Sequence, residues 1–350
     1  MKILLINNRY PTENNPQPGA YVKSMRECME LTGAKVDILV MDQSWKGGKQ
    51  KLRNYLKYYQ EVFKFPDYSK YDLVYINHFP HIFPALRPHF GKMKRALIHW
   101  HGTEIFAANR KSAVLNAISH KLIPKRFQHI APSNYFKEVL MHAVGISSNK
   151  ITVSPSGGVD TEVFKPISVS EDSPKFVLGF TSAITEEKGA DLLVSLAKAI
   201  PTMEKQLGRT IEIKLIAYGK QKDQFIQQIG QYVKADVIAP VPKEEMADLY
   251  NSFSLLLFPT RGDSLGLVAL EAMACGIPVV GSNDFGLKEY LESGQTGEAF
   301  PTGDGKAFVG ATLKTLQQLD NYNPRKVVLE KYSKQSVVRF YLQMFKDLED

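Results

Sequence analysis

Short apolar strands alternate with helical segments along the whole chain, and this alternation is the feature that most limits its fold. It is typical of parallel sheets that are covered by helices on both faces. The predicted strands of the first half are residues 2–7, 35–40, 73–76, 96–99, 129–131 and 151–153. Those of the second half are residues 176–179, 211–216, 237–238, 255–258 and 278–280, followed by helices over residues 306–319 and 334–348. We therefore predict an α/β fold with two doubly wound, Rossmann-like domains.

The domain boundary is expected near residue 165. A chain of 350 residues is too long for one ordinary core. The strand pattern pauses in a glycine turn at residues 157–160, and residues 166–174 are polar and strand-free. We predict domains over residues 1–165 and 166–350, with the last helix a candidate for packing back on the first domain. Two such domains would leave a cleft between the carboxyl ends of their strands, where these folds bind ligands.

The charge of the chain is unevenly distributed. Residues 1–165 hold 24 Lys and Arg against 12 Asp and Glu, whereas residues 166–350 hold 20 against 24. The first half is thus expected to meet an anionic partner, either a membrane surface, a phosphorylated acceptor or a nucleic acid. Cys28 and Cys275 are the only cysteines, which favours a cytoplasmic protein without disulfides. The apolar start is too short for a signal peptide, and no run of about 18 apolar residues predicts a membrane span.

Residues 258–280 are the most informative segment and are predicted as strand, loop, helix, loop and strand. Asp263 and Glu271 would mark the two ends of the helix, separated by roughly 12 Å along its axis, with Gly266 in the first turn. That arrangement suits a long ligand whose anionic part lies at the helix N-terminus. The alternative is an ordinary buried helix between two strands, with both acids in solvent.

The same segment resembles the E-x7-E signature of retaining GT-B glycosyltransferases of family 4, with Asp263 where the family usually has Glu. Residues 157–166 also resemble the family's interdomain segment, and the likeness extends over nearly the whole chain. It implies the GT-B fold, with an acceptor-binding first domain and a second domain for the nucleotide-sugar. The implied reaction transfers a hexosyl group from a UDP-sugar, or alternatively a GDP-sugar, to a glycan or lipid-linked acceptor in cell-envelope polysaccharide synthesis, with retention.

The resemblance also implies roles for residues of the second domain. Glu271 would accept both ribose hydroxyls, Lys188 would hold the diphosphate, and Asp263 would bind a hydroxyl of the transferred sugar. The family's arginine is missing beside Lys188, and Arg261 is our predicted substitute. Tyr218 and Gly219 would border the nucleotide base, although an aromatic residue at a strand end can equally serve packing. Backbone amides at the helix start are expected to add donors, at Ser264, Leu265, Gly266 and Leu267.

Fewer residues of the first domain are implicated. His101 matches a family histidine near the anomeric centre, whereas His99 is expected in the core; a histidine at a strand end is otherwise more often structural. Gly19 alone matches the family's glycine loop over the donor phosphates. Residues 45–64 mix cations with aromatics at the spacing of a helix face, which predicts either membrane contact or core packing. The family favours membrane contact, hence a peripheral location on the inner face of the membrane.

Several chemistries are disfavoured by missing patterns. The chain has no Asp-x-Asp triplet and no His/Cys cluster with metal-ligand spacing, so we expect neither metal nor cofactor. Basic and aromatic residues are not interleaved outside residues 45–64, which disfavours nucleic acid. Two alternatives stay open. One is a nucleotide-sugar epimerase or glycan phosphorylase on the same scaffold, and the other is a nonenzymatic binder of anionic lipid or nucleic acid.

Overall fold

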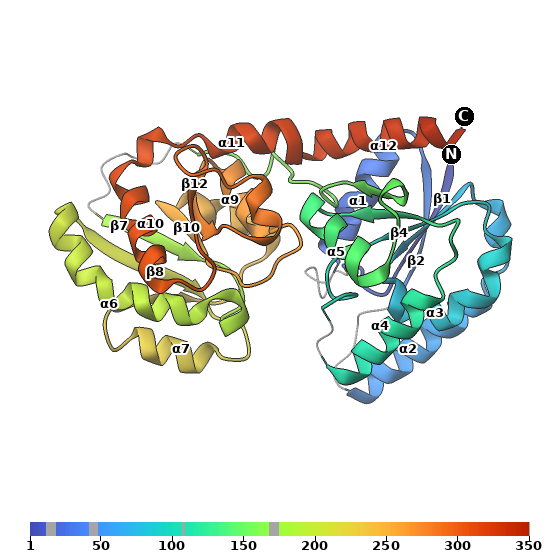
Figure 1. The fold of residues 1–350 in the computed structure, drawn as a ribbon, viewed down its shortest axis with the longest axis horizontal. Helices are drawn as coiled ribbons and strands as arrows, with labels where there is room; N and C mark the ends of the chain where they lie inside the picture. The colour runs from blue at the N-terminus through green and yellow to red at the C-terminus, as the bar shows by residue number, and fades with distance from the viewer. Residues whose placement is uncertain (12–18, 42–47, 107–108, 168–174, 350) are drawn as a thin grey trace. The chain divides into compact units, whose positions relative to one another are not determined.

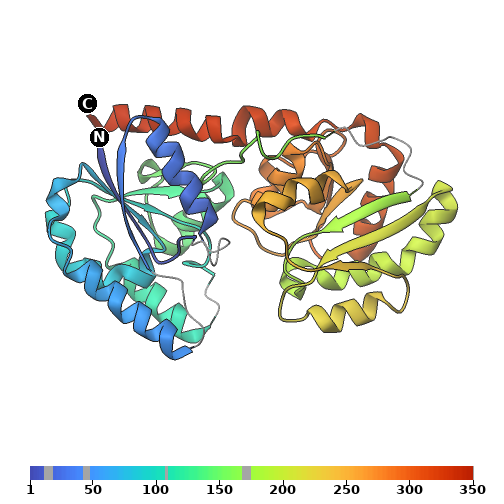
Figure 2. The same cartoon turned by 180° about the vertical axis from the view of Figure 1, so that it is seen from behind.

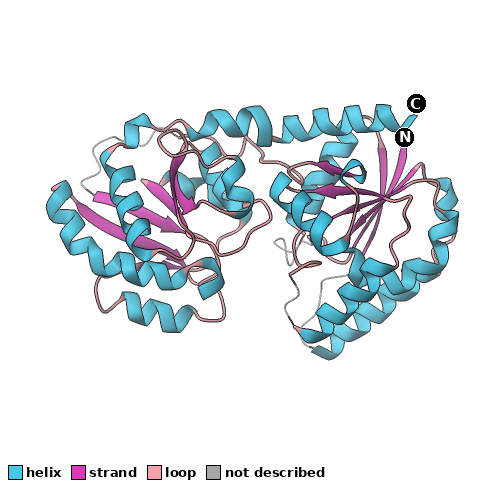
Figure 3. Cartoon of the chain, viewed as in Figure 1, coloured by secondary structure: helices cyan, strands magenta, loops and turns pink. Residues whose placement is uncertain are grey.

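The computed structural model describes residues 1–11, 19–41, 48–106, 109–167 and 175–349. They form two six-stranded sheets, in which all the strand pairings are parallel, with helices between successive strands (Figure 1, Figure 3). The strand order is β2-β1-β3-β4-β5-β6 in one sheet and β12-β11-β10-β7-β8-β9 in the other. The predicted fold class, two doubly wound parallel sheets, is confirmed.

The chain divides into two compact units, and each sheet belongs to one of them. The first unit comprises Met1–Gly158 with Lys334–Asp350, and the second comprises Val159–Ser333. Val159 and Phe164 are buried in the core of the second unit, so the boundary falls before them and earlier than residue 165. The last helix, α12, belongs to the first unit.

The elements of the first unit follow the predicted alternation. Its strands are β1 (Lys2–Asn7), β2 (Lys35–Val40), β3 (Leu73–Asn77), β4 (Ala96–His99), β5 (Gln128–Ala131) and β6 (Ile151–Val153). Its α-helices are α1 (Ala20–Leu31), α2 (Gly48–Phe63), α3 (Phe79–Leu86), α4 (Arg110–Lys121), α5 (Asn134–Val144) and α12 (Lys334–Glu349).

The second unit has the same pattern with one unexpected strand. Its strands are β7 (Lys175–Phe180), β8 (Thr210–Ile216), β9 (Asp236–Ile238), β10 (Leu255–Phe258), β11 (Val279–Ser282) and β12 (Gly297–Phe300). Its α-helices are α6 (Ala190–Leu207), α7 (Lys222–Ile229), α8 (Met246–Asn251), α9 (Leu267–Ala274), α10 (Gly305–Gln317) and α11 (Pro324–Val327). β12 was not predicted, because it begins with glycine and contains no β-branched residue.

α12 covers one face of the first sheet together with α1 (Figure 2). Val337, Tyr341 and Phe345 recur at helical spacing and are buried with the apolar face of α1. The hydroxyl groups of Tyr341 and Tyr75 lie 2.9 Å apart, and Lys334 forms an ion pair of 2.6 Å with Glu27 of α1. The opposite face of this sheet packs on a separate cluster that includes residues of α2, α3 and α5.

Each sheet reverses its strand order at one point, and ligands bind at such points in folds of this type. In the first unit the reversal lies between β1 and β3, and in the second it lies between β7 and β10. Gly19 follows β1, Lys188 follows β7 and Asp263 follows β10, whereas His101 and Tyr218 follow the neighbouring strands β4 and β8.

Candidate functional site

The segment after β10 is a loop of eight residues followed by a short helix. α9 begins at Leu267, so Asp263 lies in the preceding loop and the predicted helix with an acid at each end is corrected. The reason is Gly266, whose φ of 85° is left-handed and ends the helix on its N-terminal side. A Cβ atom on Gly266 would lie 2.5 Å from the Tyr290 hydroxyl oxygen, which itself donates to the Leu265 carbonyl at 2.8 Å.

Lys188 and Asp263 meet at the switch point of the second sheet. Lys188 ends the short 3-10 helix Glu186–Lys188 after β7, and Asp263 follows β10. The Lys188 ammonium lies 3.1 Å from Asp263 Oδ2, 2.9 Å from the Gly262 carbonyl oxygen and 3.5 Å from Thr260 Oγ1. Both side chains of the pair are 24% exposed. The two predicted residues therefore form a solvent-accessible ion pair.

Gly189 makes this approach possible. Its φ is 80°, and a Cβ atom there would lie 2.2 Å from the carbonyl oxygen of Pro259. Only glycine allows the start of α6 to lie this close to the end of β10. The Lys-Gly pair seen in the sequence is thus explained by backbone packing as well as by charge.

Arg261 lies next to this pair and is itself paired. Its Nη1 and Nη2 lie 2.6 and 2.7 Å from the two carboxylate oxygens of Asp191, at the start of α6. Its guanidinium also donates to the Glu186 carbonyl, and its backbone N–H donates to that of Glu187. Arg261 therefore ties the loop after β10 to the segment after β7. Sequence reasoning missed Asp191, whose separation of 70 residues from Arg261 gives no local signal.

Glu271 occupies the inner part of α9. The hydroxyl of Tyr250 donates to Glu271 Oε2 at 3.3 Å, and burial raises the pKa of Glu271. Near Tyr250, the hydroxyl of Thr181 is buried and has no hydrogen-bond partner among the described residues. The pKa of Tyr250 is raised by burial and, secondarily, by the Glu271 charge, so the phenol keeps its proton and acts as the donor. Tyr250 was not among the predicted site residues.

Tyr218 and Gly219 follow β8, next to this group. The Tyr218 hydroxyl donates to the Thr181 carbonyl at 3.1 Å, and 40% of the residue is exposed. Gly219 has a φ of 113°, and a Cβ atom there would lie 2.5 Å from the backbone nitrogen of Ile184. Both predicted residues thus border the same sheet edge as Lys188.

The predicted amide donors at the start of α9 are only partly available. The Leu265 N–H already donates to Asp263 Oδ1 at 3.2 Å. The Ser264 residue also has a partner, whereas Gly266 and Leu267 lie at the helix start itself. This edge of the second unit is therefore rich in charge, and the charges found there are arranged in pairs.

His101 lies at the corresponding edge of the first unit, two residues after the end of β4. Its Nε2 lies 2.8 Å from Asn77 Oδ1 at the end of β3, and its ring stacks on that of His99 at 4.5 Å. His99 is buried and bonded through Nδ1 to the Tyr75 hydroxyl at 2.7 Å, in agreement with its expected core position. Burial lowers the pKa of both rings, to about 3 for His99.

A hydroxyl, an imidazole and a carboxylate lie in a row beside His101. The Tyr21 hydroxyl is 2.5 Å from His78 Nε2, and His78 Nδ1 is 3.5 Å from Glu104 Oε1. Both oxygens of Glu104 also accept from the backbone N–H of His101 at 3.2 Å. Sequence reasoning missed Tyr21, His78 and Glu104, because they come from three separate segments, the start of α1, the residue before α3 and the turn after β4.

Burial favours the neutral forms of the groups in this row, although Glu104 is still partly ionised at neutral pH. Burial lowers the pKa of His78 well below its ordinary value and raises that of Glu104 to about 7. Because burial also raises the pKa of Tyr21, its hydroxyl keeps its proton and donates to His78 Nε2. The proton of His78 then resides on Nδ1 and faces Glu104. The edge of the first unit thus presents hydrogen-bonding groups whose neutral forms are favoured by burial.

Gly19 is the remaining predicted residue of the first unit. It caps α1 with a φ of 78°, and a Cβ atom there would lie 2.6 Å from the Arg9 carbonyl oxygen. Gly19 therefore allows the segment after β1 to pass close to the start of α1. The other residues of the predicted phosphate loop, 16–18, lie outside the described residues, as do residues 45–47 of the basic segment.

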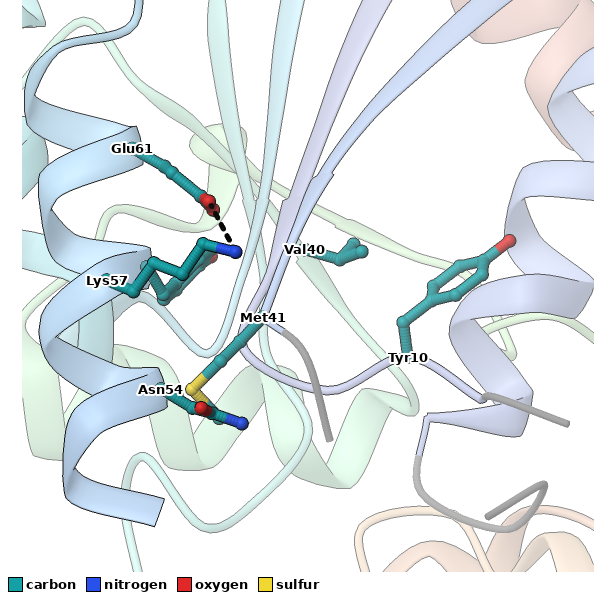
Figure 4. Close-up of a pocket in the computed structure, with 7 residues that line it drawn as sticks. Tyr10, Val40, Met41, Asn54, Lys57 and Glu61 are labelled. Atoms are coloured by element: carbon teal, nitrogen blue, oxygen red, sulfur yellow. Dashed lines mark ion pairs between the residues drawn. The ribbon is translucent and has the colours of Figure 1, made fainter. Parts of the chain in front are cut away.

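A cavity of about 340 Å³ lies between α2 and the ends of β1 and β2 (Figure 4). Lys57 and Glu61, one helical turn apart on α2, form an ion pair of 3.7 Å at its side. The hydroxyl of Tyr58 is buried without a hydrogen-bond partner in the described part of the chain. The cavity is lined by Tyr10, Val40, Met41, Asn54, Lys57, Tyr58 and Glu61.

Two family models match the chain, Glycosyltransferase Family 4 over residues 28–163 and Glycosyl transferases group 1 over residues 162–335. The chain belongs to this family of group 1, family 4 glycosyltransferases. In the described residues, no helix is long and apolar enough to cross a membrane.

Curated relatives match part of their own length. The D-inositol 3-phosphate glycosyltransferase 1 of Catenulispora acidiphila is 30% identical over 163 residues, which are 42% of this chain and 38% of that protein. The capsular polysaccharide biosynthesis glycosyltransferase CapM of Staphylococcus aureus is 25% identical over 252 residues, 67% of this chain and 60% of its own. The chain thus spans about two fifths to three fifths of these relatives.

Solved structures match the whole chain. A sucrose-phosphate synthase from Thermosynechococcus elongatus superposes with a TM-score of 0.78 at 17% identity and covers 99% of both chains. HepE of Anabaena, in complex with UDP and glucose, has a TM-score of 0.74 at 16% identity and covers 99% of this chain and 100% of its own. These likenesses show the fold, and the predicted GT-B architecture is confirmed.

Proposed function

We propose that this protein is a retaining glycosyltransferase that moves a hexosyl group from a nucleoside-diphosphate sugar to a glycan or lipid-linked acceptor. A UDP-sugar is the favoured donor and a GDP-sugar the alternative. The observation that carries the proposal is the Lys188–Asp263 pair at the switch point of the second sheet, with Glu271 on α9, the helix that follows the Asp263 loop. HepE, a structural neighbour, is seen with UDP-glucose, and CapM acts in capsular polysaccharide biosynthesis, which supports a cell-envelope product.

The second unit would hold the donor. Glu271 accepts the ribose hydroxyls through its carboxylate, which Tyr250 orients. Lys188 faces the diphosphate, and the exposed face of Tyr218 borders the base. Arg261 adds positive charge at this edge while its guanidinium is paired with Asp191. Gly266 and Leu267 supply backbone amides at the start of α9, where the helix dipole favours anions.

Catalysis would rest on stabilising the departing diphosphate while the sugar becomes oxocarbenium-like. In a front-face transfer, an oxygen of the leaving phosphate accepts the proton of the acceptor hydroxyl. No protein nucleophile is then needed. His101, whose Nε2–H is directed to Asn77 Oδ1, would contact the sugar. We propose that no metal or other cofactor takes part, because Lys188 and the helix amides supply the positive charge.

The donor proposal is tested by calorimetry of UDP, GDP and ADP in the presence of EDTA. We expect one nucleotide to bind, and Glu271→Gln to weaken it about 100-fold, because the hydrogen bonds lose their charged acceptor and an amide NH2 replaces one of the two carboxylate oxygens. Glu292→Gln is the control, since Glu292 is exposed before β12 at the opposite edge of the sheet. Equal binding by wild type and Glu271→Gln would overturn the site. Donor turnover without acceptor would indicate an epimerase, and dependence on phosphate a phosphorylase.

The basic first unit would bind the acceptor at a membrane. Two neighbouring stretches expose apolar side chains next to cations: Leu52, Leu56 and Phe63 on α2, and Val114, Ile118 and Leu122 on and just after α4. Both helices pack on α3. We propose that they rest on the anionic inner face of the membrane. The adjacent cavity would take a polar part of the acceptor, whose hydroxyl would satisfy Tyr58.

Vesicle sedimentation tests this location. Wild type is expected to bind phosphatidylcholine vesicles that contain phosphatidylglycerol, and not pure phosphatidylcholine. Leu56→Glu should weaken vesicle binding about tenfold, because the free energy of burying the leucine side chain in the membrane interface is lost. Leu329→Glu, at another exposed leucine, in the second unit, is the control. Equal binding by both variants would exclude α2 from the contact.

A further inference from the structure

Both carboxylate oxygens of Asp263 are engaged, one by its own loop and the other by a lysine. Its Oδ1 accepts the Leu265 N–H at 3.2 Å, and its Oδ2 lies 3.1 Å from the Lys188 ammonium. The resemblance assigns the acid at this position to a hydroxyl of the transferred sugar. Here both carboxylate oxygens already have partners, and aspartate is one methylene shorter than the family's usual glutamate.

Lys188 is fully engaged by the same loop. Its three N–H groups have three acceptors, of which Asp263 is the only charged one, the others being the Gly262 carbonyl and Thr260 Oγ1. A diphosphate that binds here has to exchange with one of these acceptors. Because two anions next to one ammonium repel each other, the carboxylate is the acceptor that a diphosphate displaces.

The neighbouring ion pair shows why exchange takes place at Lys188. Arg261 and Asp191 are joined by two short, parallel hydrogen bonds of 2.6 and 2.7 Å. A bidentate guanidinium–carboxylate pair of this kind is held more firmly than a single ammonium contact. The Lys188–Asp263 contact is a single, longer one of 3.1 Å, and exposure does not distinguish the pairs, since 24% of Lys188 and Asp263 and 29% and 35% of Arg261 and Asp191 are exposed. Of the two pairs, it is the one that opens to a competing anion.

We propose that Asp263 is a positioning residue whose carboxylate competes with the diphosphate of the donor for the Lys188 ammonium. When the nucleotide binds, Lys188 turns from the carboxylate to the phosphate oxygens. After transfer, the ion pair between Asp263 and Lys188 forms again, and this favours dissociation of the nucleoside diphosphate. No bond is made or broken in this exchange. The inference rests on the proposed donor site and adds a role in product release.

The proposal and the sugar-binding role make opposite predictions for the nucleotide alone. If Asp263 competes for Lys188, Asp263→Asn leaves the ammonium unopposed, and UDP should bind about tenfold more tightly. The same variant should show stronger product inhibition by UDP. If Asp263 contacts the sugar, UDP affinity is unchanged and only the nucleotide-sugar binds more weakly.

The test is calorimetry of the nucleoside diphosphate that wild type binds, with Asp263→Asn, Asp263→Glu, Lys188→Ala and Lys188→Ala/Asp263→Asn. We expect tighter binding in Asp263→Asn, affinity near wild type in Asp263→Glu, and no effect of Asp263→Asn in the Lys188→Ala background. Asp320→Asn, at an exposed aspartate of the second unit, is the control. Unchanged or weaker binding by Asp263→Asn would overturn the exchange. Failure of wild type to bind UDP, GDP or ADP would overturn the donor site and the exchange with it.

Discussion

The two units place different chemistry at the same topological position. At the switch point of the second sheet lie two partly exposed ion pairs, Lys188–Asp263 and Arg261–Asp191. At that of the first sheet lies a buried row of Tyr21, His78 and Glu104, in which burial favours the neutral forms. One scaffold thus supports a site suited to an anionic ligand and another suited to uncharged hydroxyl groups.

The difference follows from burial. A charged group keeps its charge where water or a counter-ion reaches it, and loses it where neither does. The lysine and arginine of the second unit are partly exposed and paired, whereas the rings of the first unit are enclosed by one another. If the comparison is right, variants in the second unit act on nucleotide affinity and variants in the first act on turnover.

The largest expected effect is the loss of turnover in His101→Ala. Removing a ring that contacts the sugar should lower kcat about 100-fold, a typical loss for a polar group at a reacting centre. UDP affinity should stay within about twofold, since no charge is removed. His142→Ala, at an exposed histidine of α5, is the control. A fall in UDP affinity as large as in Glu271→Gln would break the comparison between the units.

Glu104→Gln should change how stability depends on pH. The pKa of Glu104 is raised by burial from 4.5 to about 7, so the folded state binds its proton more tightly than the unfolded state. Wild type should therefore lose stability relative to the variant as pH rises from about 4.5 to 7, by at most roughly 3 kcal/mol. Scanning calorimetry of both proteins across this range measures the change. Parallel curves would show that Glu104 is not held in its neutral form.

Arg261→Ala should have the smallest effect of these variants, and it tests which role Arg261 has in the charged site. Loss of its partly exposed pair with Asp191 is expected to lower stability by about 1 kcal/mol. We also expect UDP affinity to fall about threefold to tenfold, because the loop after β10 is no longer held by Arg261. Asp191→Asn separates two explanations: it should weaken UDP binding if the pair holds the loop, and strengthen it if Arg261 contacts phosphate. Full UDP affinity in Arg261→Ala would exclude Arg261 as the substitute for the family's arginine.

The fold could be predicted from the sequence because buried parallel strands are apolar throughout. β1, β2, β4, β6 and β10 have the predicted bounds. β12 was missed because its side chains have no strand preference, and its position is fixed by pairing with β11. Local patterns predict a strand well where apolar residues form a run, and poorly where pairing with a neighbouring strand fixes the conformation.

The candidate site was predicted in part for the same reason. Lys188 and Asp263 were recognised from local motifs, and the structure brings them together. Asp191, which pairs with Arg261, and Tyr250, which donates to Glu271, were not recognised, since contacts across 70 and 21 residues leave no periodic pattern. His78 was missed because its position depends on a left-handed backbone conformation, with a φ of 49°, which the local sequence does not predict.

The assignment of α12 to the first unit has a consequence for synthesis on the ribosome. The second unit is one continuous stretch, Val159–Ser333, and is complete before α12 has been translated. Most of the first unit precedes the second along the chain, yet Val337, Tyr341 and Phe345 of its core follow the second unit. Although domains generally fold from the N-terminus during translation, here the earlier unit has to wait with one face of its sheet uncovered. We expect the later unit to reach its native state first.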